Sequence, residues 1–344
     1  MAIRTQEDFF DLLTKSRLLD KDQLLQAKEL ARDLSEPTTT GRKLVAEGLL
    51  SRWQVTQLLS GHDSSYLGKY RLIDELEATA TNRLYLALEE DSGMRVNLKT
   101  VPRLQSDDDQ RLEKFKADVK SIKKLKHPNI SRVLAVDQQK SGCYLVTEHH
   151  KGTTLDRMVD EHGALPIPIA TDYIYQVATA LKDAHDRQLW HGDIRPATLL
   201  VTADDVVKIQ DMGLALLADS RVSDSLGVAG LRPELVDYMA PEQANGHADE
   251  RSDFYSLGCT FYYLLCGRPP FPHGSTLDRL MEHQEAEAES MLVLRHDTPQ
   301  LLVDLCRAMM AKSPEERPAK MESITRRLDV WIMQHLSDMR NRDE

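Results

Sequence analysis

The chain has 344 residues, of which 41% are hydrophobic and 29% are charged, and its formal net charge is -11. This length allows two or three compact units with cores of their own. The acidic balance argues against a nucleic-acid partner, because such partners are bound mainly by clustered Lys and Arg. A protein partner or substrate of basic or neutral character is favoured instead.

The cysteines lie far apart in the sequence and lack CxxC spacing: Cys143, Cys259, Cys266 and Cys306. They predict reduced core residues rather than a zinc site or a disulfide framework. The first residues, MAIRTQEDFFDLL, lack the apolar segment of a secretory leader. No window approaches the roughly 18 apolar residues of a membrane span, so we expect a cytoplasmic protein.

Residues 7–60 contain a loose internal repeat in which Ser16, Leu18, Leu19 and Gln23 are matched 31 residues later by Glu47, Leu49, Leu50 and Gln54. In each copy an N-cap residue, Asp20 or Ser51, follows a Leu pair and precedes an amphipathic run. The repeat predicts a small helical domain of two hairpins over 1–62, followed by a polar linker over 63–69. This domain carries no catalytic cluster, so we expect a docking or packing module.

After residue 69 the pattern changes to short β-type runs, at 70–76, 83–88, 95–101, 130–137 and 143–148. One charged amphipathic helix is predicted in their midst, over 108–126. From Thr154 onward the pattern is helical except for two short strands, 199–201 and 207–209. We therefore predict an α+β fold with a β-rich N-lobe over 70–148, a helical C-lobe over 149–335 and a polar tail over 336–344.

Five motifs follow one another along this region: VNLK at 96–99, HPNI at 127–130, HGDIRP at 191–196, DMG at 211–213 and APE at 240–242. In this order they resemble the motifs of protein kinases, of the bacterial eukaryotic-like Ser/Thr type. The segment 253–258 resembles the helix that anchors the catalytic loop through Asp253. Arg317 matches the arginine that forms a buried ion pair with the Glu of APE, Glu242. The helical front domain resembles one found before some planctomycete kinases.

The resemblance implies a bilobal kinase fold that uses ATP and Mg²⁺, with a role for each matching residue. Lys99 would hold the α and β phosphates, and Asp211 would ligate Mg²⁺. Asp193 would orient the substrate hydroxyl and accept its proton, with Arg195 in place of the usual Lys beside it. The resemblance also implies that adenine is contacted by Leu84, Val146, Leu200 and the hinge from Glu148 to His150, with Thr147 as gatekeeper. It further implies that Asp118 pairs with Lys99. His191, Met212 and Ile122 would form an internal column.

Several positions depart from the family pattern. The stretch that would be glycine-rich, 77–82, contains no glycine, although glycine lets the backbone approach phosphates closely, and Glu77 adds a negative charge. Thr198 replaces the Asn that holds a second metal and is a weaker ligand. Asn97 places an amide where an alanine methyl normally covers adenine, and that amide needs a partner. Gly192 replaces the arginine that grips a phosphorylated activation segment.

Three functions stay open at this point. The first is a pseudokinase, a kinase fold that binds partners, with or without nucleotide, and transfers negligible phosphate, because several altered positions act on one phosphate site. The second is a slow Ser/Thr kinase, because Lys99, Asp193 and Asp211 are all present. The third is an adaptor in which the helical front domain is the functional part. The pair His149–His150 is interpreted as structural or solvent-facing.

Overall fold

The computed structural model describes residues 3–63, 65–78, 83–101, 117, 119–139, 142–212 and 233–343. The segment 79–82, Asp118 and nearly all of the predicted helix before residue 119 lie outside these residues. The chain falls into two compact units, residues 1–103 with 135–149 and residues 104–134 with 150–344. Among the described residues, no helix combines the length and the apolar character needed to cross a membrane.

The first unit begins with the helices that the repeat predicts: α1 (Gln6–Ser16), α2 (Lys21–Leu30), α3 (Pro37–Ala46) and α4 (Arg52–Leu59). Both predicted N-caps are confirmed, and each forms a complete capping box. Asp20 caps α2 with Gln23, and Ser51 caps α4 with Gln54. The apolar positions between the helices form a common buried core: Phe9, Leu13, Leu18, Ala27, Leu44, Leu50, Val55 and Leu58.

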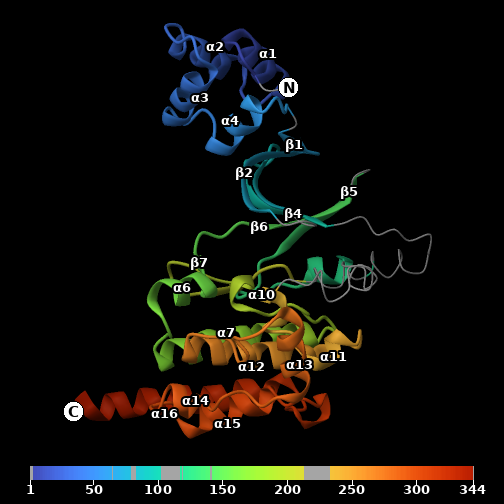
Figure 1. The fold of residues 1–344 in the computed structure, drawn as a ribbon, viewed down its shortest axis with the longest axis vertical. Coiled ribbons are helices and arrows are strands. Elements are labelled where there is room, and N and C mark those ends of the chain that lie inside the picture. The colour runs from blue at the N-terminus through green and yellow to red at the C-terminus, as the bar shows by residue number, and fades with distance from the viewer. Residues whose placement is uncertain are drawn as a thin grey trace. The chain divides into compact units, whose positions relative to one another are not determined.

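A curled sheet follows in the same unit (Figure 1), with the strand order β1-β2-β3-β4-β6-β5 among the described residues. The predicted strands are present with ends shifted by at most three residues: β2 (Tyr70–Ala78), β3 (Arg83–Glu89), β4 (Arg95–Val101), β5 (Val133–Gln139) and β6 (Gly142–Glu148). The segment expected to be a linker contains β1 (Tyr66–Leu67), which pairs with β2. The helical domain and the sheet therefore belong to one compact unit.

The register of the strands decides which side chains share a face of the sheet. Lys99 pairs with Leu84 and Leu145, and Asn97 pairs with Leu86 and Thr147. Because paired residues project to the same side, these six side chains lie on one face. The opposite face carries the buried side chains of Tyr85, Ala87, Val96, Leu98 and Val146.

The second unit is mainly helical and carries a small sheet of the order β7-β8-β9. Strands β8 (Leu199–Val201) and β9 (Val207–Ile209) match the predicted ranges, and β7 (Thr153–Thr154) joins them. The helical segments are α6 (Leu155–His162), α7 (Ile167–His185), η1 (Pro196–Thr198), α10 (Pro233–Val236), α11 (Pro241–Ala244), α12 (Glu250–Cys266), α13 (Thr276–Glu285), α14 (Met291–Leu294), α15 (Gln300–Met309), η3 (Pro314–Glu316) and α16 (Met321–Asp343).

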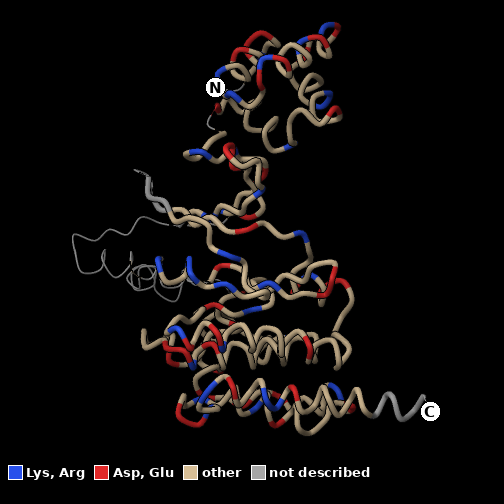
Figure 2. Tube along the Cα trace, turned by 180° about the vertical axis from the view of Figure 1, so that it is seen from behind, with Lys and Arg blue, Asp and Glu red and all other residues tan. Residues whose placement is uncertain are grey.

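Helix α12 is the centre of this unit, because it is buried along nearly its whole length and packs on both α7 and α15. Gly258 lets α15 approach closely, since a Cβ there would lie 2.9 Å from the Cβ of Met309. Helix α16 packs along α7 and continues to Asp343, so the stretch expected as a polar tail is helical in its described part. Figure 2 shows acidic and basic residues interspersed along these helices.

Candidate active site

A fully buried carboxylate anchors the loop that carries the HGDIRP motif. Asp253 on α12 accepts hydrogen bonds from the backbone N–H groups of His191 at 2.8 Å and Gly192 at 2.7 Å. It also accepts one from Nε2 of His185, at the end of α7, at 2.8 Å. Burial acts to raise the pKa of Asp253, but the hydrogen bonds and the nearby histidines outweigh it and hold that pKa below its usual value. The loop is therefore fixed to two core helices.

The imidazole of His191 joins this loop to the DMG motif. Its Nδ1 accepts the backbone N–H of Asp193 at 3.1 Å, so its Nε2 carries the proton and donates to the carbonyl of Gln210 at 2.7 Å. Gln210 directly precedes Asp211. His191 and Met212 are both buried, as the expected internal column requires.

Asp193 presents the accessible carboxylate of the loop. Its side chain is 33% exposed, and the Nε of Arg195 lies 3.1 Å from Oδ1 and 3.3 Å from Oδ2. Arg195 is itself nearly buried. An accessible carboxylate on an anchored loop is the arrangement that a proton acceptor for a hydroxyl requires.

Thr198 uses its hydroxyl inside the loop. Its Oγ1 lies 3.0 Å from the carbonyl oxygen of Asp193 and 2.9 Å from that of Arg195, and it accepts the backbone N–H of Arg195 at 3.2 Å. These contacts occupy the hydroxyl proton and a lone pair. The arrangement favours a structural role for Thr198 over the metal-binding role that the sequence suggested.

The backbone of Asp211 has a left-handed conformation, with φ of 59°. For a residue other than glycine this conformation costs on the order of 1 kcal/mol, and such strain is concentrated at functional sites. The neighbouring Gln210 is held by its backbone N–H, which donates to the carbonyl of Thr198 at 2.8 Å. The backbone just before Asp211 is therefore tied to the loop that carries Asp193.

In the first unit, Lys99 and Leu84 lie on the same face of the sheet and are register partners. Val146 was predicted to contact adenine together with Leu84, but it pairs with Leu98 and is fully buried on the opposite side of the sheet. The prediction for Val146 is wrong because side chains alternate along a strand, so its neighbour Thr147 points to the face of Lys99. Glu148, the last residue of β6, pairs with Val96. Of the other predicted adenine contacts, Leu200 on β8 and His150 belong to the second unit.

The amide of Asn97 has the partner that its burial requires. Its Oδ1 lies 2.9 Å from Nδ1 of His149, within the same unit. The carbonyl oxygen can only accept, so Nδ1 of His149 carries the proton. The pair places a polar group on the face of Lys99, where the sequence alone suggested only a disfavoured amide. This bond is compatible with the structural role that was expected for His149.

The ion pair expected between Glu242 and Arg317 is present, with two contacts of 2.7 Å. The other N–H groups of Arg317 donate to the carbonyl oxygens of Ala311, Arg251 and Lys312, so all five donors of the guanidinium are used. Burial acts to raise the pKa of Glu242, but hydrogen bonds from Arg317 and Ser252 outweigh it and lower that pKa.

A protein kinase domain model matches residues 75–328. This chain belongs to the protein kinase family. A probable serine/threonine-protein kinase of Clostridium perfringens is 35% identical over 208 residues, which are 60% of this chain and 30% of that protein. Serine/threonine-protein kinase PrkC of Bacillus subtilis is 28% identical over 252 residues, 73% of this chain and 38% of PrkC.

Serine/threonine-protein kinase PknA of Mycobacterium tuberculosis is 31% identical over 256 residues, 73% of this chain and 58% of PknA. The chain thus spans less than two thirds of the curated relatives that it matches. Among solved structures, the PknI kinase domain of Mycobacterium tuberculosis has the same fold, with a TM-score of 0.60 and 21% identity over 77% of this chain and 98% of that chain.

Sequence reasoning missed several residues that build this kinase loop. His185 gives Asp253 its third hydrogen bond, and Gln243 donates to the carbonyl of Gly192 at 2.9 Å. Asn129 of the HPNI motif donates to the carbonyl of Val207 at 2.9 Å. Two of these had a usable signal: Asn129 lies within a recognised motif, and Gln243 directly follows APE. His185 had none, because its partner is far away in the sequence.

The described residues include no cluster of three or more His, Cys, Asp or Glu that could hold a metal by itself. For a kinase this donor set still fits Mg²⁺ in part, since Mg²⁺ is usually held by one or two carboxylates together with substrate phosphates. Asp211 would supply the carboxylate. Because the hydroxyl of Thr198 is already hydrogen-bonded within the loop, it is a poor ligand for a second metal ion.

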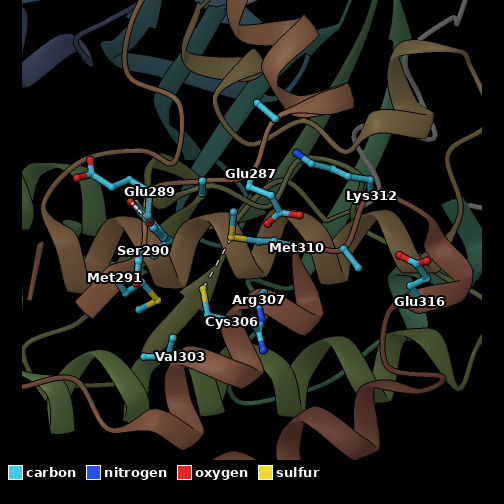
Figure 3. Close-up of a pocket in the computed structure, with 14 residues that line it drawn as sticks. Glu287, Glu289, Ser290, Met291, Val303, Cys306, Arg307, Met310, Lys312 and Glu316 are labelled. Atoms are coloured by element: carbon cyan, nitrogen blue, oxygen red, sulfur yellow. Dashed lines mark hydrogen bonds between the residues drawn. The ribbon is translucent and has the colours of Figure 1, made fainter. Parts of the chain in front are cut away.

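A separate cavity of about 380 Å³ lies in the second unit (Figure 3), and none of the kinase motif residues discussed above lines it. Cys306 lines the cavity, and its thiol lies 3.8 Å from Sδ of Met310. Burial raises the pKa of Cys306 well above its usual value, which makes the thiol unreactive. Both acidic and basic side chains surround the cavity, and Glu289 is paired with Arg268. Nothing in this lining selects a ligand by charge.

Proposed function

We propose that this protein is a slow ATP-dependent serine/threonine protein kinase that transfers the γ-phosphate of ATP to a protein hydroxyl. The observation that carries the proposal is the anchored loop, on which Asp193 is accessible and Asp253 fixes the backbone on its N-terminal side. Phosphoryl transfer depends mostly on positioning and charge neutralisation, and a rigid loop supplies the positioning. The names of the relatives, all serine/threonine kinases, support the same substrate class.

Each proposed role follows from the position of the side chain. Lys99 would bind the α and β phosphates from the sheet face that it shares with its register partner Leu84. Asp211 would bind Mg²⁺, which neutralises the phosphates of ATP when it is bound. Asp193 would accept the proton of the substrate hydroxyl, and Arg195 would hold that carboxylate in place. We expect slow turnover because Thr198 serves the loop and residues 77–82 contain no glycine.

A pseudokinase is the second candidate, and the pair formed by Asn97 and His149 is the observation that favours it. An amide held on the nucleotide face replaces a methyl group with a polar surface. Adenine would then have to accept a hydrogen-bonded amide as a neighbour instead of an apolar contact. This candidate predicts partner binding with no measurable phosphate transfer.

A transfer assay separates the two candidates. Purified chain with radiolabelled ATP and Mg²⁺ is expected to phosphorylate itself or a basic protein slowly, and Asp193→Asn is expected to lower the rate by about 100-fold or more, because it removes the proton acceptor. Asp183→Asn, which changes a partly exposed carboxylate on α7 paired with Arg187, is the matched control and should leave the rate unchanged. Absence of transfer by the unaltered chain, or equal rates in both variants, would refute the kinase proposal.

A further inference from the structure

The second copy of the helical repeat bonds directly to the sheet through its own capping box. Nε2 of Gln54 donates to the carbonyl of Leu72 at 2.7 Å, and the hydroxyl of Ser51 donates to the carbonyl of Ile73. Both acceptors belong to β2, at the point where its pairing with β3 shifts register between Leu72 and Asp74. The two side chains therefore hold the backbone of β2 at the place where its regular pairing with β3 is interrupted.

The first copy of the repeat has the same capping box without this contact. Gln23 accepts the backbone N–H of Asp20 through Oε1, as Gln54 does with Ser51. Gln23 makes no side-chain hydrogen bond to any described strand, and it is only half buried, whereas Gln54 is 6% exposed. The chain thus contains two matched caps, of which one is joined to the sheet.

Next to this contact, α4 packs on the face of the β2–β3 hairpin that points away from Lys99. Trp53, which directly precedes Gln54, packs edge-on against Tyr85 with ring centroids 5.7 Å apart. Tyr85 projects to the face opposite that of Lys99, because its register partner is Leu98. Two further bonds reach the same sheet from the first hairpin, since Arg71 donates to the carbonyl of Leu18 at 2.7 Å and Tyr66 to that of Arg17 at 3.0 Å.

We propose that Ser51 and Gln54 are positioning residues of the nucleotide site: the second helical hairpin braces the β2–β3 hairpin from its outer face and thereby sets nucleotide affinity. The link to nucleotide affinity rests on the proposed function, whereas the brace itself does not. Strand β3 of this hairpin carries Leu84, the register partner of Lys99, which would bind the phosphates of ATP. A brace from outside the kinase domain restricts the movement of this hairpin.

Replacing Gln54 by Glu tests the brace with little change to the helix. A carboxylate keeps the oxygen that accepts the N–H of Ser51, and Glu is a favoured residue at this position of a capping box. It loses the N–H that serves Leu72 and sets an anionic oxygen against that carbonyl. Gln23→Glu makes the same chemical change in the first copy, where no strand bond is present, and is the matched control.

Two readouts on the full chain decide the outcome. In Gln54→Glu, hydrogen exchange of the amides in 71–77 and 84–88 is expected to accelerate by about tenfold, and the dissociation constant of MgATP to rise by a similar factor. Adenosine binding should weaken less, because Lys99, the register partner of Leu84 on this hairpin, would bind phosphates that adenosine lacks. A generally unfolded lobe would weaken the binding of both ligands alike. Gln23→Glu should change exchange and affinity by less than about twofold.

Equal exchange in the two variants would overturn the brace. Faster exchange in Gln54→Glu with unchanged MgATP affinity would overturn its link to the nucleotide site. An unaltered chain that binds no MgATP would refute the proposed kinase function, and the exchange comparison would still decide whether the second hairpin holds β2 and β3.

Discussion

Replacing Arg317 by Met is expected to lower the free energy of unfolding by about 3–5 kcal/mol, because it leaves the Glu242 carboxylate buried without its cation. The same substitution leaves three backbone carbonyls without the hydrogen bonds that the guanidinium donates to them. Arg317→Lys should recover little, since an ammonium has three donors and cannot form the bidentate contact. Urea unfolding followed by circular dichroism measures the change.

Arg326→Met is the matched control for this substitution. Arg326 pairs with Glu322 on α16 at 3.1 Å, but the two side chains are 73% and 55% exposed, so its loss should cost about 0.5 kcal/mol or less. The double variant Arg317→Met with Glu242→Leu should regain part of the lost stability, because it removes the uncompensated charge. A cost for Arg317→Met as small as that of the control would contradict this account of the ion pair.

The stabilisation from Glu242 also has a predicted pH dependence. The pKa of Glu242 is lower in the folded chain than in the unfolded chain, so its contribution is complete above the ordinary glutamate pKa and disappears as the pH falls through the folded value. Between pH 7 and pH 3, the free energy of unfolding should therefore fall less steeply in Arg317→Met than in the unaltered chain, because Glu242 has lost the partner that lowers its pKa. Parallel curves for the two proteins would contradict this assignment.

Replacing Asp253 by Ala is the second substitution with a large expected effect, again about 3–5 kcal/mol. It removes the common acceptor of two backbone N–H groups and of His185, and each donor left unsatisfied in a buried place costs about 1–3 kcal/mol. Because these donors include the catalytic loop, phosphate transfer should fall together with stability. Unfolding curves and the transfer assay give the two readouts.

Asp249→Ala provides the comparison for Asp253→Ala on the same helix. Asp249 caps the N-terminus of α12 and accepts the N–H of Arg251 at 2.8 Å, so its loss should cost about 1 kcal/mol and leave transfer unchanged. If Asp253→Ala were no more destabilising than Asp249→Ala, the buried carboxylate would not be the anchor of the loop.

Local signals made much of the fold predictable. Capping boxes at Asp20 and Ser51, alternating strand patterns and the order of five motifs each depend on residues close together in the sequence. The strands of the first unit follow from these signals, whereas the pair of Glu242 with Arg317 was predicted from the resemblance to protein kinases. Contacts that depend on tertiary packing did not follow, because nothing near Gln54 indicates that its amide meets β2.

The site shows the same division between local and distant information. The positions of Lys99, Asp193 and Asp211 were predicted from motifs, whereas the adenine contact predicted for Val146 did not take the alternation of side chains along β6 into account. The bond between Asn97 and His149 joins two strands' ends and became visible only with the register. Thr198 was considered only as a metal ligand, since the loop geometry that engages its hydroxyl is not encoded in one residue.

The central claim is that the chain retains a working nucleotide site despite its altered phosphate-binding segment. Thermal unfolding with millimolar ATP, with and without Mg²⁺, tests it on the unaltered chain, Lys99→Met and Asp211→Asn. We expect a rise in melting temperature of about 3–8 °C with MgATP, by mass action on the folded state, and loss of most of it in both variants. No rise at millimolar MgATP, or an equal rise in all three proteins, would contradict the claim.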